Sequence, residues 1–212
     1  MKVTLSFDNG PTETTGEVLD TLAERGILAS FFVVGAELEK PGRRALTERA
    51  AAEGHWVGNH TMTHSIQFGD CDDPTLPARE IGQAQALLGP LAHPDKLFRP
   101  YGGGGILDRR LLNPAAITYL RANDYTCVLW NNVPHDWDRP DDWVSQCLAE
   151  IHARPWSLVV LHDLPSGAMR HLPAFLDELD ARGVDLVQEF PEATVPIYRG
   201  AQRESLADLS VS

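Results

Sequence analysis

Short apolar segments alternate with amphipathic segments along almost the whole chain. Residues 2–7 read KVTLSF, a run typical of a strand, and residues 14–26 carry apolar side chains at helical spacing until Gly26 ends the pattern. The alternation repeats about seven times, up to a last short apolar run at residues 184–187. Strands that alternate with helices form a parallel sheet with right-handed connections, so the chain is predicted to be an α/β protein.

A single TIM-like barrel with fewer than eight units is the favoured architecture. The 212 residues suit one domain, which we place at residues 1–200. An open doubly wound sheet is the alternative, but no G-x-G-x-x-G sequence follows the first strand. Residues 201–212 are polar and are expected to form a frayed C-terminal tail.

The charge and composition exclude several classes of partner. The formal net charge is -12, so a nucleic-acid backbone or an anionic membrane is not an expected partner. No apolar run reaches the roughly 20 residues of a membrane span, and no signal peptide precedes the first strand. Three widely spaced cysteines without a C-x-x-C pair indicate reduced thiols. We therefore expect a cytoplasmic protein.

Polar side chains of catalytic types follow the predicted strands, at the point where each strand ends. They are Asp8, Asn9, His60, His64, Arg99, Asp136 and His162. In a parallel barrel the carboxyl ends of all strands open on one face, so these side chains should share one pocket. His60 and His64 are four residues apart, which on a helical turn would place both imidazoles on one side as metal ligands.

Five short segments resemble the motifs of the polysaccharide deacetylase (NodB-homology) family, which is similar to carbohydrate esterase family 4. They are SFDNGP, NHTMTH, RPYG, HDW and LVVLHD, in the family's order, between residues 6 and 163. The resemblance implies a distorted, incomplete (β/α) TIM-like barrel of about seven strands. It also implies a hydrolase that acts on a non-peptide carbon–nitrogen bond, usually the N-acetyl group of an amino sugar.

The resemblance assigns a role to each matching residue. Asp8 would be the general base and Arg99 the residue that orients it. His162 would be the general acid, tuned by Asp136. The backbone N–H of Tyr101 would stabilise the oxyanion. These roles agree with the chemistry of the side chains, because a carboxylate can remove a proton from water and an imidazolium can protonate a leaving amine.

Four further residues complete the predicted site. His60 and His64 match the two metal-binding histidines of the family. Val160 lies two residues before His162 on the same face of its strand, so it could contact the acetyl methyl group. Trp137, in the loop at the rim of the site, is the best candidate for a platform on which a sugar ring stacks.

Asn9 stands where the family normally has a second aspartate, the third metal ligand. An amide oxygen can bind a metal but carries no charge, so affinity for a dication should fall. Three arrangements remain open: Asn9 completes a divalent metal site, Asp8 moves to ligate, or the site works without metal. Because Asn-Gly pairs deamidate, a fraction of molecules could also carry a carboxylate at this position.

The sequence therefore predicts metal-assisted N-deacetylation of an amino sugar or a small N-acetylated carbohydrate, with zinc as the expected metal. The expected partner is a small molecule or an oligosaccharide, and the oligomeric state is left open. Two alternatives remain because of Asn9. One is a metal-independent amidohydrolase of a cyclic ureide, and the other is a non-catalytic protein that binds a sugar or a partner.

Overall fold

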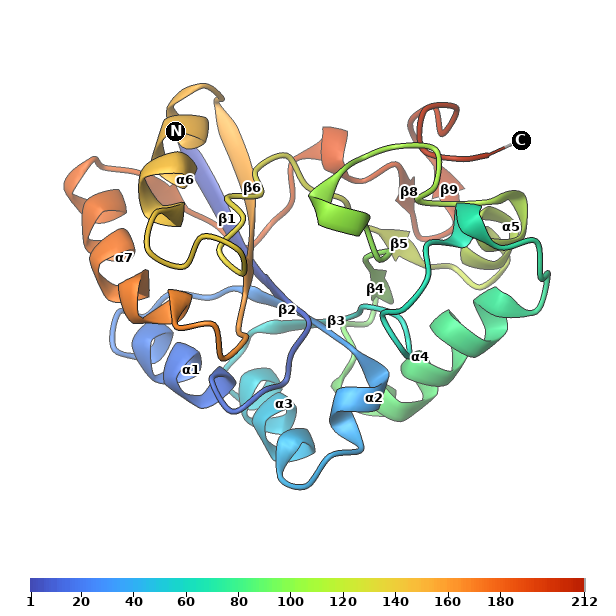
Figure 1. Cartoon of the computed structure of the whole chain (residues 1–212), viewed down its shortest axis with the longest axis horizontal. Helices are drawn as coiled ribbons and strands as arrows, with labels where there is room; N and C mark the ends of the chain where they lie inside the picture. Colours follow the sequence, from blue (N-terminus) through green and yellow to red (C-terminus); the bar gives the residue numbers. More distant parts are fainter. Residues whose placement is uncertain (212) are drawn as a thin grey trace.

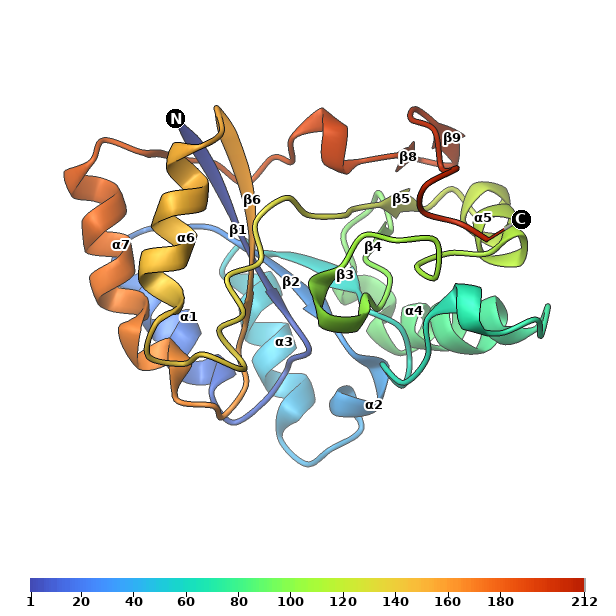
Figure 2. The same ribbon diagram turned by 45° about the horizontal axis from the view of Figure 1, so that its top comes forward.

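A curled sheet forms the centre of the molecule, and helices cover its outer side (Figures 1 and 2). The computed structural model describes residues 1–211. Its strands follow the order β6-β1-β2-β3-β4-β5-β8-β9, and β7 pairs with β1. The strands are β1 Lys2–Asp8, β2 Ser30–Val33, β3 Trp56–Asn59, β4 Leu97–Phe98, β5 Thr126–Cys127, β6 Trp156–His162, β7 Asp185–Leu186, β8 Ile197–Tyr198 and β9 Ala201–Gln202.

The parallel part of the sheet confirms the predicted distorted barrel. Strands β1 to β7 pair in parallel with their neighbours, whereas β8 pairs antiparallel with β5 and β9 pairs antiparallel with β8. Strand β5 is much shorter than the apolar run at 125–131 predicted, because only Thr126 and Cys127 pair with β4 and the Leu129 N–H donates to the Thr194 carbonyl outside the strands. Asn132 then forms a parallel bridge with Val159 of β6, which brings this segment back to the far edge of the sheet.

In the described part of the chain, seven α-helices pack around this sheet. They are α1 Thr15–Ala23, α2 Gly35–Leu38, α3 Arg43–Ala52, α4 Gln83–Leu88, α5 Pro114–Ala122, α6 Trp143–His152 and α7 Leu172–Ala181. The sequence predicts all of them except α2, whose four residues are too few for a periodic pattern. Helix α5 begins where expected, because the Asn113 side chain accepts a hydrogen bond from the Ala116 N–H and Pro114 occupies the first helical position.

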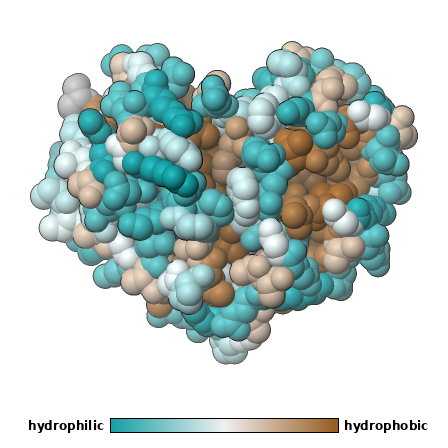
Figure 3. All heavy atoms as spheres, turned by 180° about the vertical axis from the view of Figure 1, so that it is seen from behind, coloured by the Kyte–Doolittle hydropathy of each residue, from teal (hydrophilic) through white to brown (hydrophobic). Residues whose placement is uncertain are grey.

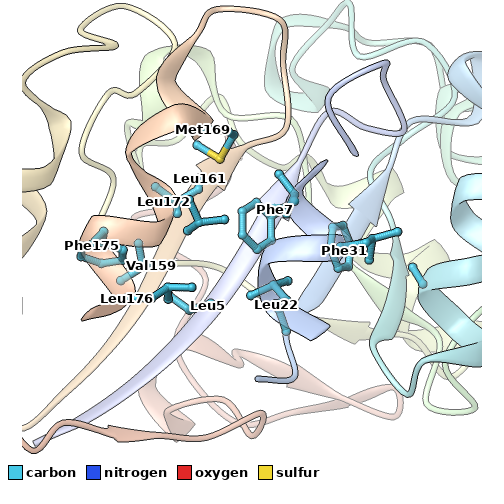
Figure 4. Close-up of a cluster of buried hydrophobic side chains, with 14 of the residues drawn as sticks. Leu5, Phe7, Leu22, Phe31, Val159, Leu161, Met169, Leu172, Phe175 and Leu176 are labelled. Atoms are coloured by element: carbon cyan, nitrogen blue, oxygen red, sulfur yellow. The ribbon is translucent and has the colours of Figure 1, made fainter. Parts of the chain in front are cut away.

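The largest hydrophobic core lies between the sheet and helices α1, α6 and α7. Side chains of β1 and β6, among them Phe7 and Leu161, point toward Leu172 and Phe175 (Figure 4). Phe7 also stacks on Phe31 of β2, with 5.1 Å between the ring centroids. This packing holds β1 and β6 rigidly beside each other, and both strands end in the candidate site.

The alternation of side chains along β1 separates the core from the site. Val3, Leu5 and Phe7 face the core, so the intervening Ser6 and Asp8 face the other side of the sheet. Ser6 and Asp8 are both buried. A strand that presents a carboxylate to the inside of a curled sheet needs a buried cation there, and Arg99 supplies it.

The C-terminal segment packs against the rest of the protein up to residue 211. Leu206 is only 6% exposed and belongs to a second core cluster around α5, and the Leu112 N–H donates to the Leu209 carbonyl at 2.9 Å. The expectation of a frayed tail was therefore wrong for this part. The segment is polar in composition, but its Leu206 and Leu209 both pack against this second cluster.

The hydropathy of the surface differs between two parts of this face. Seen from behind, hydrophobic residues gather in the right half of the view, whereas the left lobe is mostly hydrophilic (Figure 3). Within residues 1–211, none of the helices combines the length and the apolar character needed to span a membrane.

Candidate active site

Asp8 and His162 lie side by side at the ends of two paired strands. Asp8 is the last residue of β1 and His162 the last of β6, and the two are direct partners in the parallel register. Neighbouring strands are about 4.8 Å apart, so their backbones bring an acidic and an imidazole side chain to one place. The prediction that strand ends gather these residues is confirmed for this pair.

Arg99 holds the Asp8 carboxylate inside the barrel. Its Nη1 donates to Asp8 Oδ1 at 2.7 Å and to Ser6 Oγ at 2.8 Å. The remaining nitrogens donate to the carbonyls of Val128 and Leu129, at 3.2 and 3.1 Å. Arg99 is fully buried and Asp8 is 3% exposed. A guanidinium fixed at every nitrogen cannot turn away, so it orients the carboxylate and gives it a buried counter-charge.

Asp136 holds His162 in the same way. The Nδ1 of His162 lies 2.8 Å from Asp136 Oδ1, and the His162 backbone N–H donates to Asp136 Oδ2, also at 2.8 Å. Burial alone lowers the pKa of His162, but the hydrogen bond and the charge of Asp136, together with Asp8 and Asp163, outweigh it. The net effect is a raised pKa, which keeps the imidazole protonated to a higher pH.

Replacing Asp136 with asparagine should narrow the pH range of activity. A general acid works only while protonated, so the rate falls as pH rises through its pKa. Asp136→Asn removes the charge that raises the pKa of His162, and the alkaline limb of the kcat profile should move to lower pH. The exposed Asp138→Asn is the matched control. An unmoved alkaline limb in Asp136→Asn would argue against His162 as the acid.

The two candidate metal histidines are both neutral and face each other. Burial lowers the pKa of both His60 and His64 to about 3, and their ring centroids are 4.8 Å apart. The Nδ1 of His60 lies 2.8 Å from the Arg99 carbonyl, which can only accept. The proton is therefore on Nδ1, and Nε2 has a free lone pair. The distance from Nε2 to Asp8 Oδ2 is 3.6 Å.

The segment between the two histidines is not the helical turn that the four-residue spacing predicted. Thr61 and His64 both have positive φ, at 70° and 51°, and the chain bends between them. Such conformations cost about 1–3 kcal/mol each and persist only where surrounding contacts enforce them. The imidazoles lie close together because of this bend.

The surroundings of Asn9 fit a divalent metal. Asn9 Oδ1 is buried, and no donor within residues 1–211 bonds to it, which leaves its lone pairs for a ligand. The residue has a φ of 73°, a left-handed conformation that asparagine tolerates well. In the described part of the chain, no three His, Cys, Asp or Glu side chains could hold a metal together. The third protein ligand would therefore be this neutral amide.

A cavity of about 240 Å³ connects these groups. Eight of the ten predicted site residues line it: Asp8, Asn9, His60, His64, Tyr101, Trp137, Val160 and His162. The ninth, Arg99, supports Asp8 from behind. The tenth, Asp136, supports His162. The structure thus brings all the predicted site residues together.

The apolar part of the cavity is formed by Val160, Leu164 and two tryptophans. The ring of Trp137 stands edge-on to His162, with 4.6 Å between centroids, and the Tyr101 ring lies 4.3 Å from that of His64. Trp130 is buried, and it also lines the cavity.

Two contributors were not identified from the sequence. Ser6 accepts a hydrogen bond from Arg99, and its place two residues before Asp8 on β1 was the available signal. Asp163 is fully buried, and burial raises its pKa to about 6. Its Oδ2 accepts from the Thr15 hydroxyl, and its carbonyl accepts from the Thr12 hydroxyl, so it fixes the turn after Asn9.

Two buried acid–base pairs beside two neutral imidazoles form a hydrolytic site with metal-ligating capacity. This class of site agrees with the comparisons with known proteins. The family model for polysaccharide deacetylases matches residues 1–128. The chain belongs to the polysaccharide deacetylase family and is an enzyme, a hydrolase, as its motifs predicted.

Two curated deacetylases are similar in sequence to most of this chain. The chain is 39% identical over 166 residues to a chitooligosaccharide deacetylase of Sinorhizobium fredii, which covers 76% of this chain and 71% of the relative. It is 28% identical over 205 residues to a peptidoglycan-N-acetylglucosamine deacetylase of Bacillus cereus, with 91% and 71% covered.

Solved structures have the same fold. A T48 deacetylase with bound substrate has a TM-score of 0.70 at 27% identity, covering 88% of this chain and 87% of that one. A family 4 acetyl xylan esterase from Clostridium thermocellum, in complex with a cobalt ion, has a TM-score of 0.71 at 26% identity, with 89% and 88% covered. The metal ion bound in that esterase agrees with the pair of neutral histidines in this chain.

Proposed function

We propose that this enzyme removes the N-acetyl group from an amino sugar in an oligosaccharide, with zinc as the metal. The observation that carries the proposal is the register of β1 and β6, which places Asp8 directly beside His162. Each of the two has its own buried partner, Arg99 and Asp136. A base and an acid that line the same cavity are what amide hydrolysis requires.

Asp8 takes a proton from the water that attacks the acetyl carbonyl carbon. A carbon–oxygen bond forms, and the carbonyl oxygen becomes an oxyanion near the backbone N–H of Tyr101. The carbon–nitrogen bond then breaks while His162, protonated on Nε2, gives that proton to the leaving nitrogen. The products are acetate and a free amine. Arg99 and Asp136 move no proton themselves but hold Asp8 and His162 in place.

His60, His64 and Asn9 are the residues that would hold the metal. When bound, a divalent metal polarises the acetyl carbonyl and lowers the pKa of bound water. The neutral imidazoles suit zinc, which prefers nitrogen ligands. Because Asn9 carries no charge, the site should bind the metal more weakly than one completed by a carboxylate.

The walls of the cavity suit an acetyl group on a sugar. Val160 and Leu164 are apolar and lie near His162, where the methyl group would point. The ring of Trp137 stands at the same wall, with an aromatic surface that suits a pyranose. The relatives named for chitooligosaccharides and for N-acetylglucosamine of peptidoglycan support an N-acetylglucosamine unit as the substrate.

Replacing Asn9 with aspartate should strengthen the metal site. A carboxylate adds a charged ligand at the same place, so zinc should bind about ten- to a hundredfold more tightly. The dissociation constant can be measured by competition with a chromogenic chelator. Deacetylation of N-acetylchitooligosaccharides at limiting zinc should rise in parallel.

Intact mass of the parent protein must accompany this measurement, because deamidation of Asn9 would create the same carboxylate. Asn123→Asp, on an exposed residue, is the matched control. Equal zinc affinity in parent and Asn9→Asp would show that Asn9 is not a ligand. Absence of zinc binding and of turnover in both proteins would overturn the proposed function.

A further inference from the structure

The segment from His60 to His64, called here the histidine loop, is held by a residue outside the cavity. We infer that Glu80 is a positioning residue that sets the shape of this loop and thereby the separation of the two imidazoles. The inference rests on the proposed function in that the imidazoles are taken as metal ligands. Glu80 is only 7% exposed and does not line the cavity.

Four consecutive backbone N–H groups of the loop donate to side chains. The Met62 N–H and the Thr63 N–H both donate to Glu80 Oε2, at 3.1 and 2.9 Å. The Thr63 hydroxyl donates to the other carboxylate oxygen at 2.9 Å. The Thr61 N–H donates to Asn59 Oδ1 at 2.9 Å, and the His64 N–H donates to Thr61 Oγ1 at 3.0 Å. Glu80 Oε2 therefore accepts from two of the four backbone N–H groups.

The carbonyl side of the loop is fixed by helix α2. The N–H groups of Gly35 and Ala36, at the start of that helix, donate to the carbonyls of Thr61 and Met62 at 2.9 Å each. Close approach is required here, because a Cβ at Gly35 would lie 2.6 Å from the Met62 sulfur. The loop is thus held between α2 on one side and Glu80 on the other.

Glu80 lies in an unusual turn that also anchors the start of the loop. Residues Ala78–Gly82 form a π-helical turn before α4. The carbonyl of Ile81 in this turn accepts a hydrogen bond from Asn59 Nδ2 at 2.9 Å. Single π turns inside helices are frequent at functional sites, because the extra residue changes which groups face outward. Here the turn directs both Glu80 and the Ile81 carbonyl at the histidine loop.

The backbone of the loop needs these acceptors. Thr61, a β-branched residue, and His64 both have positive φ, which such residues adopt only when neighbouring contacts enforce it. Without Glu80, two partly buried donors would lose their partner, and the loop would relax toward ordinary φ values. The two imidazoles would then no longer be held at their 4.8 Å separation.

The test compares Glu80→Ala and Glu80→Gln with the parent protein. Arg79→Ala is the matched control. Arg79 occupies the same turn but contacts Asp73 and Thr75 on the outside. Zinc affinity is measured by chelator competition, and exchange of the Met62 and Thr63 amides is followed by NMR in the metal-free protein. Thermal unfolding reports on stability alone.

In Glu80→Ala, zinc should bind about ten- to a hundredfold more weakly, and both amides should exchange quickly. Glu80→Gln, which keeps an acceptor oxygen, should recover part of both properties, and Arg79→Ala should resemble the parent. Parental affinity with protected amides in a folded Glu80→Ala would overturn the inference, even if unfolding occurred at a lower temperature. If the parent bound no zinc, the proposed metal role would fail, and amide exchange alone would decide the role of Glu80.

Discussion

Asp8→Asn should lower kcat/KM for deacetylation by about 10²- to 10⁴-fold, the contribution typical of a positioned general base. An asparagine in this place keeps an oxygen that can accept from Arg99 but cannot take a proton from water. The substitution is nearly isosteric, so the cavity should keep its shape. The measurement is steady-state hydrolysis of N-acetylchitooligosaccharides at saturating zinc.

Zinc content separates two possible functions of Asp8. If Asp8 acts as the base, Asp8→Asn should bind zinc nearly as well as the parent. If Asp8 has replaced Asn9 as a ligand, zinc affinity and activity should fall together. Asp177→Asn, on an exposed side chain of α7, is the matched control. Activity of Asp8→Asn above about a tenth of the parental value would contradict the proposed mechanism.

Arg99→Met should lower the free energy of unfolding by about 3–5 kcal/mol. Methionine fills much of the space of the arginine stem but leaves the Asp8 carboxylate buried without its cation. It also leaves the carbonyls of Val128 and Leu129 without donors. Chemical denaturation at neutral pH measures this change.

Two further variants test whether the loss of stability in Arg99→Met comes from the unpaired charge of Asp8. Asp8→Asn combined with Arg99→Met should be less destabilised than the sum of the single changes, because no unpaired charge is left. Arg110→Met breaks an exposed ion pair with Asp108 and should cost less than about 1 kcal/mol. A loss in Arg99→Met no larger than in Arg110→Met would mean that the buried pair does not stabilise the fold.

The positions of the catalytic side chains could be predicted because they depend on a repeating pattern. Asp8, Arg99 and His162 follow apolar runs, and parallel strands end on one side of a sheet whatever their order. The common direction of the parallel strands was sufficient to predict that these side chains lie on one side of the sheet, and no distance between them was needed. The same logic located Val160 on the His162 side of β6.

The shape of the histidine loop could not be predicted in this way. Its bend depends on Glu80 and on the four-residue helix α2, which are distant from it along the chain or too short for a pattern. Strands β8 and β9 were missed for a similar reason, since two-residue strands have no periodicity. Local sequence predicted the elements, and contacts between distant residues decided the geometry.

The pairing of β1 with β6 has a consequence for the order in which this enzyme is made. The ribosome synthesises Asp8 154 residues before its strand partner His162. Contacts between such distant residues form late, because a long loop must close first. The nascent chain therefore carries Asp8 without His162 while the residues between them are synthesised, and the acid–base pair is complete only after β1 has paired with β6.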